Sequence, residues 1–265
     1  MADLRPLTGQ VALVTGGNRG IGRAVACALE DAGARVALAD LAFDGAQPAA
    51  GGGGLRAAGG AAGQGPPGTM RYVVDLADPD QAMSLPMRAA DDLGRLDIVV
   101  NNAGRRGIFD FGDYPLDDWN ATLAVNLTAP FLISREASKI MVAQGGGSIV
   151  NITSVAADLG FSRRSAYNAS KAGLTGLTRS IALELGASGV RCNAVAPGII
   201  ETSLNAGYLR DAPESEAIVA GTPMGHWGQP EDVAAAVVYL CSPGAKFVNG
   251  AVIHVDGGWT TGKGY

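Results

Sequence analysis

The sequence is poor in the residues that metal centres and disulfide frameworks require. Its 265 residues include three cysteines and two histidines, and none of them cluster with the spacing of metal ligands. Cys27, Cys192 and Cys241 are odd in number and far apart, which gives no disulfide framework and is typical of a reducing compartment. We therefore expect no metal site and a cytoplasmic protein.

Long apolar runs and an excess of positive charge are also missing. No apolar stretch approaches the ~20 residues that span a bilayer, and the N-terminus lacks the basic-then-apolar layout of a secretory signal. The net charge is −5, whereas nucleic-acid binders usually present a basic face. We therefore expect neither a membrane nor a nucleic-acid partner.

Glycine is the residue in excess, with 39 copies. Part of the excess lies in the low-complexity segment 45–69, where almost no side chain is able to pack. Glycine disfavours a helix by ~1 kcal/mol per residue relative to alanine. We therefore expect a short or degenerate helix in this segment, and we expect it to be among the more mobile parts of the fold.

Short apolar runs alternate with helical stretches along the chain. The runs predict seven strands, over 11–14, 35–39, 71–74, 96–100, 148–152, 190–195 and 252–255. The helices are expected over 21–32, 78–93, 115–142, 167–185 and 231–240. Continuous apolar strands separated by helices are typical of a parallel sheet covered on both faces. No composition break divides the chain, so we predict one doubly wound, Rossmann-type α/β domain over 1–265 with a seven-stranded parallel sheet.

A glycine turn joins the first expected strand to the first expected helix. It reads Thr15-Gly16-Gly17-Asn18-Arg19-Gly20-Ile21-Gly22. Such a turn lets the backbone approach a pyrophosphate, and the helix N-terminus then supplies N–H donors. A tight turn without a ligand gives the same pattern, but its place between strand and helix favours dinucleotide binding. The residues expected at the cofactor are Gly16, Asn18, Arg19, Gly20, Ile21 and Gly22.

Asp40 ends the second expected strand and is followed by Leu41. An acidic side chain at this place can accept hydrogen bonds from the adenosine ribose hydroxyls and would repel a 2′-phosphate. Arg19 argues the other way, since a basic residue there can hold a 2′-phosphate. An anion against a phosphate is a direct penalty, whereas a solvated arginine costs nothing. We therefore expect NAD to be preferred, with NADP as the alternative.

Polar residues that could take part in a reaction follow the middle strands. Tyr167 and Lys171 stand at i and i+4 of an expected helix and share one face. A nearby ammonium and a cationic nicotinamide ring would favour the phenolate and suit Tyr167 to proton exchange with an alcohol or carbonyl. Ser154 follows the fifth strand and Asn101-Asn102-Ala103-Gly104 ends the fourth, at the edge where such sheets bind ligands. Asn126 lies within an otherwise apolar helix.

At these motifs the chain resembles the short-chain dehydrogenase/reductase family. The glycine turn, Asn101–Gly104, Asn126, Ser154, Tyr167-x-x-x-Lys171 and Pro197-Gly198 match its order and spacing over essentially the whole chain. The resemblance implies a catalytic tetrad. In it Tyr167 is the general acid/base and Ser154 orients and polarises the substrate oxygen. Lys171 binds the nicotinamide ribose and lowers the pKa of Tyr167, and Asn126 holds a water of a proton relay.

The resemblance implies further contacts and an assembly. The additional cofactor-binding residues are Asp75, Leu76, Asn102, Ala103, Gly104, Tyr167, Lys171, Pro197, Gly198, Ile200 and Thr202. Family members usually pair the helices that hold Asn126 and Tyr167 with their symmetry mates. In this chain the second of these helices has apolar positions beyond one face, which need cover on more than one side. We therefore expect a homotetramer.

The substrate wall is expected from the stretch after Gly104, from 155–166 and from a lid at about 199–227. Arginine forks bind carboxylates in a bidentate way. Arg163 is the first candidate for a substrate carboxylate, with Arg105 or Arg106 as the alternative. The last third of the chain is similar to sugar-acid members of the family, the gluconate 5-dehydrogenases and 2-dehydro-3-deoxygluconate 5-dehydrogenases.

We therefore expect an enzyme that acts on a small molecule. It would be an NAD(P)-dependent oxidoreductase that transfers hydride between nicotinamide and a secondary alcohol or ketone of a sugar acid or polyol. One alternative is a 3-oxoacyl-thioester reductase, which predicts an NADP preference that Asp40 disfavours. The other is a non-catalytic nucleotide-binding sensor, but such proteins usually lose the tyrosine or the lysine.

Overall fold

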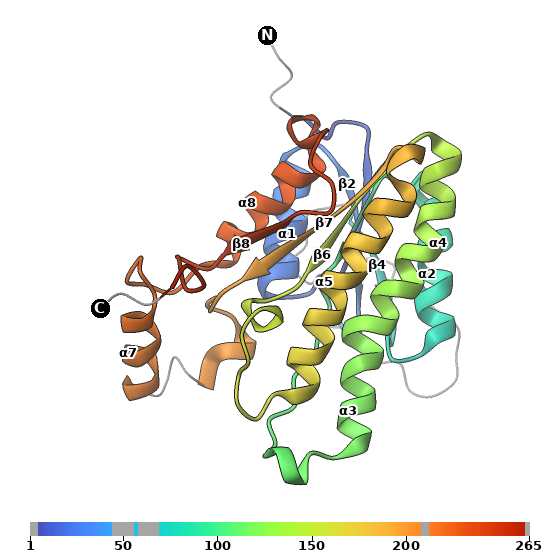
Figure 1. The fold of residues 1–265 in the computed structure, drawn as a ribbon. Coiled ribbons are helices and arrows are strands. Elements are labelled where there is room, and N and C mark those ends of the chain that lie inside the picture. The colour runs from blue at the N-terminus through green and yellow to red at the C-terminus, as the bar shows by residue number, and fades with distance from the viewer. Residues whose placement is uncertain (1–4, 44–55, 58–68, 208–211, 263–265) are drawn as a thin grey trace.

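The computed structural model describes residues 5–43, 56–57, 69–207 and 212–262. Most of the glycine-rich segment 45–69 lies outside these residues, so its degenerate helix and its mobility stay predictions. In the described part the elements alternate between strands and helices, and they build a central sheet with helices packed on both faces (Figure 1).

The sheet contains the seven predicted parallel strands. They are β1 (Val11–Thr15), β2 (Arg35–Asp40), β4 (Met70–Val73), β5 (Ile98–Asn101), β6 (Gly147–Ile152), β7 (Val190–Pro197) and β8 (Val252–Val255). Their order is β4-β2-β1-β5-β6-β7-β8, and every neighbouring pair is parallel. The two-residue β3 (Arg56–Ala57), which the sequence did not predict, pairs antiparallel with β4 at the edge. The predicted doubly wound α/β fold is confirmed.

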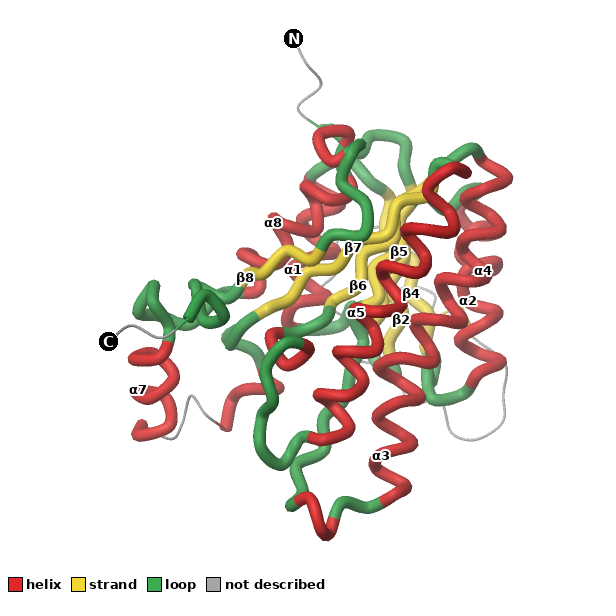
Figure 2. Tube along the Cα trace, viewed as in Figure 1, coloured by secondary structure: helices red, strands yellow, loops and turns green. Residues whose placement is uncertain are grey.

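Each face of the sheet has its own apolar core, because successive side chains of a strand point to opposite faces. Ala12 and Val14 of β1 pack in one core with α1 (Gly20–Asp31) and α8 (Pro230–Cys241). Val11 and Leu13 pack in the other core, whose helices are α2 (Pro79–Leu93), α4 (Ala129–Gln144) and α5 (Ser165–Leu185). Figure 2 shows these two helical layers on either side of the strands. This two-sided burial explains why the strands are continuous apolar runs.

The structure differs from the predicted helices in two places. The single helix expected over 115–142 is divided into α3 (Leu116–Leu123) and α4 by a π-helical turn, Ala124–Thr128. A further helix that was not predicted, α7 (Ala212–Gly221), lies near the C-terminal edge of the molecule (Figure 1). Five short 3-10 turns complete the described elements, over Phe111–Asp113, Val155–Ala157, Gly186–Ser188, Ser203–Asn205 and Pro243–Ala245.

The direction in which successive strands are added to the sheet changes between the neighbouring strands β1 and β5, which are themselves parallel. The connections from β1 lead through β2 to β4 on one side, and those from β5 lead through β6 to β8 on the other. Open α/β sheets bind ligands at such a switch point, outside the carboxyl ends of the strands. The fold therefore directs attention to the loops that follow β1, β2, β5 and β6.

Candidate active site

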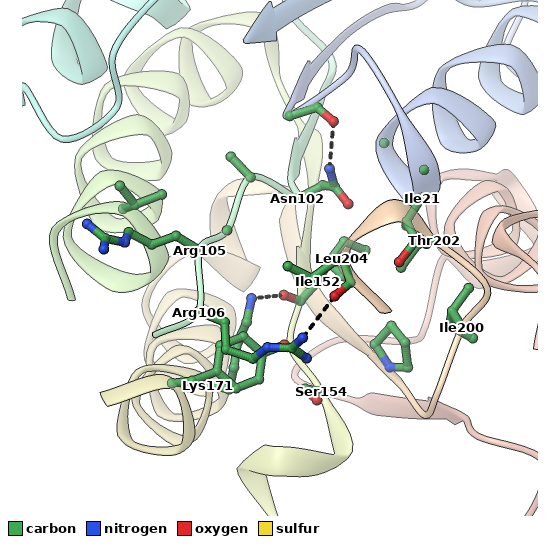
Figure 3. Close-up of a pocket in the computed structure, with 18 of the residues that line it drawn as sticks. Ile21, Asn102, Arg105, Arg106, Ile152, Ser154, Lys171, Ile200, Thr202 and Leu204 are labelled. Carbon is green, nitrogen blue, oxygen red and sulfur yellow. Dashed lines mark hydrogen bonds between the residues drawn. The ribbon is translucent and has the colours of Figure 1, made fainter. Parts of the chain in front are cut away.

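A pocket of about 800 Å³ lies at the carboxyl edge of the sheet (Figure 3). Most of the predicted site residues line it. They are Gly16, Arg19, Gly20, Ile21, Gly22, Asp40, Leu41, Asp75, Leu76, Asn102, Ala103, Gly104, Arg105, Ser154, Tyr167, Lys171, Pro197, Gly198, Ile200 and Thr202. Three predicted residues, Asn18, Asn126 and Arg163, are not part of its lining.

The glycine turn after β1 is built by close backbone approach. A Cβ atom at Gly22 would collide with the carbonyl oxygen of Gly16 and the amide nitrogen of Asn102, so only glycine fits there. Gly16 and Gly20 have φ angles of 65° and 55°, in the region that glycine adopts readily. The Asn102 side chain holds the turn in place, since its Nδ2 donates to the carbonyl oxygens of Thr15 at 2.9 Å and Gly16 at 3.0 Å.

The N-terminus of α1 fits the phosphates of a dinucleotide. The preceding Arg19 makes no side-chain capping hydrogen bond, and the first turn of the helix contains no acidic residue. Backbone N–H groups at a helix start otherwise have no intrahelical partner, and they attract anions. Gly20, Ile21 and Gly22 line the pocket at this point, so N–H donors and open space for a phosphate coincide.

Asp40 is held rigidly at the end of β2. Its Oδ2 accepts from the backbone N–H of Asn18 at 3.0 Å, and its Oδ1 accepts from that of Leu41 at 2.8 Å. Asn18 itself does not line the pocket, but its backbone N–H positions Asp40. A carboxylate has about four acceptor sites, so each oxygen can also accept from a ribose hydroxyl. Arg19 lines the same pocket.

Lys171 is buried beneath the middle of the pocket. Its side chain leaves α5 and its Nζ donates to the carbonyl oxygen of Ile152 at 2.8 Å, at the end of β6. The Nζ lies 5.7 Å from the ring centre of Tyr167, which precedes it by one helical turn. Burial lowers the pKa of Lys171 to about 8, so the side chain is positioned to donate hydrogen bonds and can also release a proton.

Tyr167 lies beside Ser154, and a side-chain hydrogen bond joins the two. Burial raises the pKa of Tyr167, while this hydrogen bond and the positive charges of Arg106 and Arg164 oppose the rise. Arg106 and Arg164 are therefore two sources of the positive charge that favours the Tyr167 phenolate. That Lys171 lowers the pKa of Tyr167 further, beside a bound nicotinamide, stays a prediction.

Asn126 acts on the pocket indirectly. It lies in the π-helical turn and is fully buried. Its Oδ1 accepts from the backbone N–H of Arg105 and its Nδ2 donates to the carbonyl oxygen of the same residue, both at 2.9 Å. Nδ2 also donates to the Ser170 hydroxyl at 3.1 Å. The side chain therefore fixes the loop after β5 against α5.

The four arginines near the site differ in direction. Arg163 has a φ angle of 63°, and its guanidinium makes a 3.0 Å ion pair with the exposed Asp110 outside the pocket. Its position does not support the prediction that it binds substrate. Arg105 lines the pocket but pairs with Asp118, and Figure 3 shows it extending away from the other labelled residues.

Arg106 and Arg164 are the arginines whose positive charges lower the pKa of Tyr167. Arg106 donates to the carbonyl oxygen of Leu204 at 2.9 Å and to Oδ1 of Asn205 at 3.2 Å. The Arg164 guanidinium lies 5.4 Å from the ring centre of Phe161, and both residues line the pocket. The sequence could not distinguish Arg164 from Arg163, because the local backbone conformation decides which of two adjacent side chains turns inward.

No three His, Cys, Asp or Glu side chains among the described residues could hold a metal ion together. Within the same residues, none of the helices has the length and apolar character needed to traverse a lipid bilayer.

Comparison with known proteins agrees with this geometry. The model of the family described as "Enoyl-(Acyl carrier protein) reductase" matches residues 16–260. The chain belongs to the short-chain dehydrogenase/reductase family. Its activity at that level, an NAD(P)-dependent oxidoreductase of an alcohol or ketone, is thereby confirmed, as is the predicted resemblance.

Several characterised relatives match over nearly their whole length. A D-threitol dehydrogenase of Mycolicibacterium smegmatis is 39% identical, over 96% of this chain and 94% of that protein. A 2-dehydro-3-deoxy-D-gluconate 5-dehydrogenase of Pseudoalteromonas atlantica is 37% identical, over 98% and 99%. The crystal structure of a gluconate 5-dehydrogenase from Burkholderia cenocepacia, in complex with NADP and tartrate, has a TM-score of 0.86 and 30% identity. The alignment with it covers 98% of this chain and 99% of that one.

Proposed function

We propose that this enzyme interconverts a secondary alcohol and a ketone on a sugar acid or a polyol. The observation that carries the proposal is one continuous pocket. Its lining includes the glycine turn and Asp40 at one end and Ser154, Tyr167 and Lys171 at the other. The relatives named for threitol and for gluconate derivatives support a polyhydroxylated substrate.

Each residue of the tetrad has a role that its contacts support. The nicotinamide supplies the hydride acceptor in oxidation and the hydride donor in reduction. Tyr167 takes the proton of the substrate hydroxyl or returns it to the carbonyl oxygen, and Ser154 hydrogen bonds to the same oxygen. Lys171, held by Ile152, binds the nicotinamide ribose. Asn126 fixes the loop that carries Arg105, and it is also the proposed holder of a relay water.

The cofactor contacts follow from the same pocket. Gly16 to Gly22 and the start of α1 hold the pyrophosphate, and the residues after β4, Asp75 and Leu76, contact the adenine. Asp40 accepts from the ribose hydroxyls, which favours NAD over NADP. Ile200 and Thr202 contact the nicotinamide amide. Gly16, Gly20, Gly22, Asp40, Asp75, Leu76, Ile200 and Thr202 all line this one pocket, which supports this arrangement.

Three expectations extend beyond the pocket. Residues at about 199–227 act as the substrate lid, and the bonds from Arg106 to Leu204 and Asn205 support this role. The chain forms a homotetramer, supported by exposed apolar side chains such as Leu183 on α5. The protein is cytoplasmic, supported by three cysteines that are all free.

A 3-oxoacyl-thioester reductase is the alternative enzyme, and a relative from Synechocystis named 3-oxoacyl-[acyl-carrier-protein] reductase, which is 38% identical, favours it. A non-catalytic sensor is the alternative from another class. The experiment is a panel of sugar acids, polyols and β-ketoacyl thioesters, each assayed with NAD(H) and NADP(H) through the absorbance of the reduced cofactor. Turnover of a sugar acid or polyol with the higher kcat/KM supports the proposal. A higher value for a thioester supports the alternative enzyme, and no turnover by a chain that binds cofactor supports the sensor.

A further inference from the structure

Charge is distributed unevenly along the pocket. The carboxylates in its described lining, Asp40 and Asp75, follow β2 and β4 on one side of the glycine turn. The lining near Ser154 and Tyr167 contains arginine and lysine side chains and, among the described residues, no carboxylate. The end of the pocket that carries the chemistry is therefore electropositive, which favours an anionic ligand.

Two of the positive groups at this end are engaged in holding the protein together. Arg105 is paired with Asp118, and its side chain extends away from the pocket's labelled residues (Figure 3). Lys171 donates to the carbonyl oxygen of Ile152 beneath the pocket. Neither geometry directs a fork of N–H donors at a substrate.

Arg106 and Arg164 are the other two arginines in the lining at this end, and the Arg106 guanidinium also donates to Leu204 and Asn205. They come from different loops, Arg106 from the loop after β5 and Arg164 from the residue before α5. Figure 3 shows the Arg106 guanidinium turned towards Leu204, to whose carbonyl oxygen it donates. Both arginines line the same pocket as Ser154 and Tyr167, and the positive charge of each lowers the pKa of Tyr167.

We propose that Arg106 and Arg164 together bind the carboxylate of the substrate, so that the enzyme acts on hydroxy acids in preference to neutral polyols. This inference rests on the proposed function, because it takes Tyr167 and Ser154 as the groups that hold the reacting oxygen. Arginine forks match the planar carboxylate. A hydrogen bond to a charged group contributes ~1.5–3 kcal/mol, or roughly 10- to 150-fold in affinity.

The test compares two substrates that differ only in the proposed anchor. D-Gluconate and D-sorbitol share a carbon skeleton, with a carboxylate in one where the other has a hydroxymethyl group. We expect Arg164→Gln and Arg106→Gln each to lower the ratio of the two kcat/KM values, acid over polyol, by roughly 10- to 150-fold. The ratio cancels any effect of the arginine on the ionisation of Tyr167. Arg163→Gln, which removes an adjacent arginine outside the pocket, should leave the ratio unchanged.

Two results of this comparison would overturn the proposal. If both substrates lose kcat/KM equally, the arginines support the loops or the lid rather than the carboxylate. If the ratio does not change, the arginines do not contact the substrate at all.

A binding measurement separates this proposal from the proposed function. L-Tartrate, a hydroxy acid, is titrated calorimetrically into the enzyme saturated with NAD⁺ or NADP⁺. We expect binding by the wild type, by Arg163→Gln and by Tyr167→Phe, and weaker binding by Arg106→Gln and Arg164→Gln. If this binding pattern is found but neither gluconate nor sorbitol is turned over, the anion site is supported and the sugar-acid and polyol activity is not. No binding, or equal binding by all variants, overturns the anion site even if turnover is found.

Discussion

The two ends of the pocket are built from different material. The end at α1 is made of backbone, with glycines packed so closely that Gly22 has no room for a Cβ atom beside Gly16 and Asn102. The end at Tyr167 is made of long side chains from separate loops, of which Arg106 reaches across to Leu204. Only glycine fits where the backbone is packed this closely, whereas a positively charged pocket end can be formed by several different arrangements of side chains. We therefore expect the cofactor end to tolerate few substitutions and the substrate end to tolerate more.

The largest effect is expected at the end of the pocket that contains Tyr167. Tyr167→Phe removes the proton-transferring hydroxyl but leaves the glycine turn intact, so turnover should fall by ~10²–10⁴ while cofactor affinity stays the same. Steady-state kinetics and a titration of reduced-cofactor fluorescence measure the two quantities. A variant that keeps a tenth of the wild-type kcat would end the assignment of Tyr167 as the acid/base.

Gly22→Ala tests the backbone end. The added Cβ atom would overlap the carbonyl oxygen of Gly16 and the Asn102 side chain, so we expect at least ~10-fold weaker cofactor binding and ~1–3 kcal/mol lower stability. Gly176→Ala is the control, because a Cβ atom there meets nothing within 4 Å and alanine suits a helix better. Calorimetric titration and thermal unfolding compare the two. Normal cofactor affinity in Gly22→Ala would show that the cradle is not closely packed around the turn.

Asp40→Ala tests cofactor choice. The wild type should have the higher kcat/KM with NAD(H). In the variant the ratio of kcat/KM with NAD(H) to kcat/KM with NADP(H) should fall roughly tenfold, because a charge-assisted hydrogen bond to the ribose is lost and Arg19 can then help to hold a 2′-phosphate. The kcat/KM values with both cofactors measure this, and thermal unfolding controls for the lost bonds to Asn18 and Leu41. Equal wild-type efficiency with both cofactors would mean that Arg19 outweighs Asp40.

The smallest expected effect is a shift of the pH profile of kcat/KM when a charge at the substrate end is removed. The positive charge of Arg164 opposes the burial that raises the pKa of Tyr167. Removing it disfavours the phenolate, so Arg164→Gln should move the rising limb of kcat/KM for alcohol oxidation to higher pH, by ~1 unit or less. Sorbitol is the substrate for this profile, because it has no carboxylate. A limb that moves to lower pH, or that moves equally in Arg163→Gln, would contradict this assignment.

The same contrast explains what could be predicted from the sequence. The seven strands were predicted because they are short apolar runs, most of them buried on both faces. The glycine turn was predicted because only glycine permits its backbone. The division between α3 and α4 carries no such signal, since Asn126 is a single buried amide in a helical pattern. Arg163 was the first candidate for a substrate carboxylate, but its left-handed backbone turns the side chain to Asp110. That conformation depends on the loop's contacts, such as the hydrogen bond from the Phe109 N–H to the Arg163 carbonyl oxygen.

The most direct test of the account is to follow the hydride itself. Reduced cofactor in which deuterium replaces both hydrogens at the transferring carbon is incubated with the enzyme and the ketone that the panel shows to react fastest, and the alcohol is analysed by mass spectrometry. The account predicts one deuterium in the product, bonded to the carbon that was the carbonyl, with transfer largely lost in Tyr167→Phe. A product without deuterium, or a chain that binds the cofactor and reduces none of the panel, would contradict it.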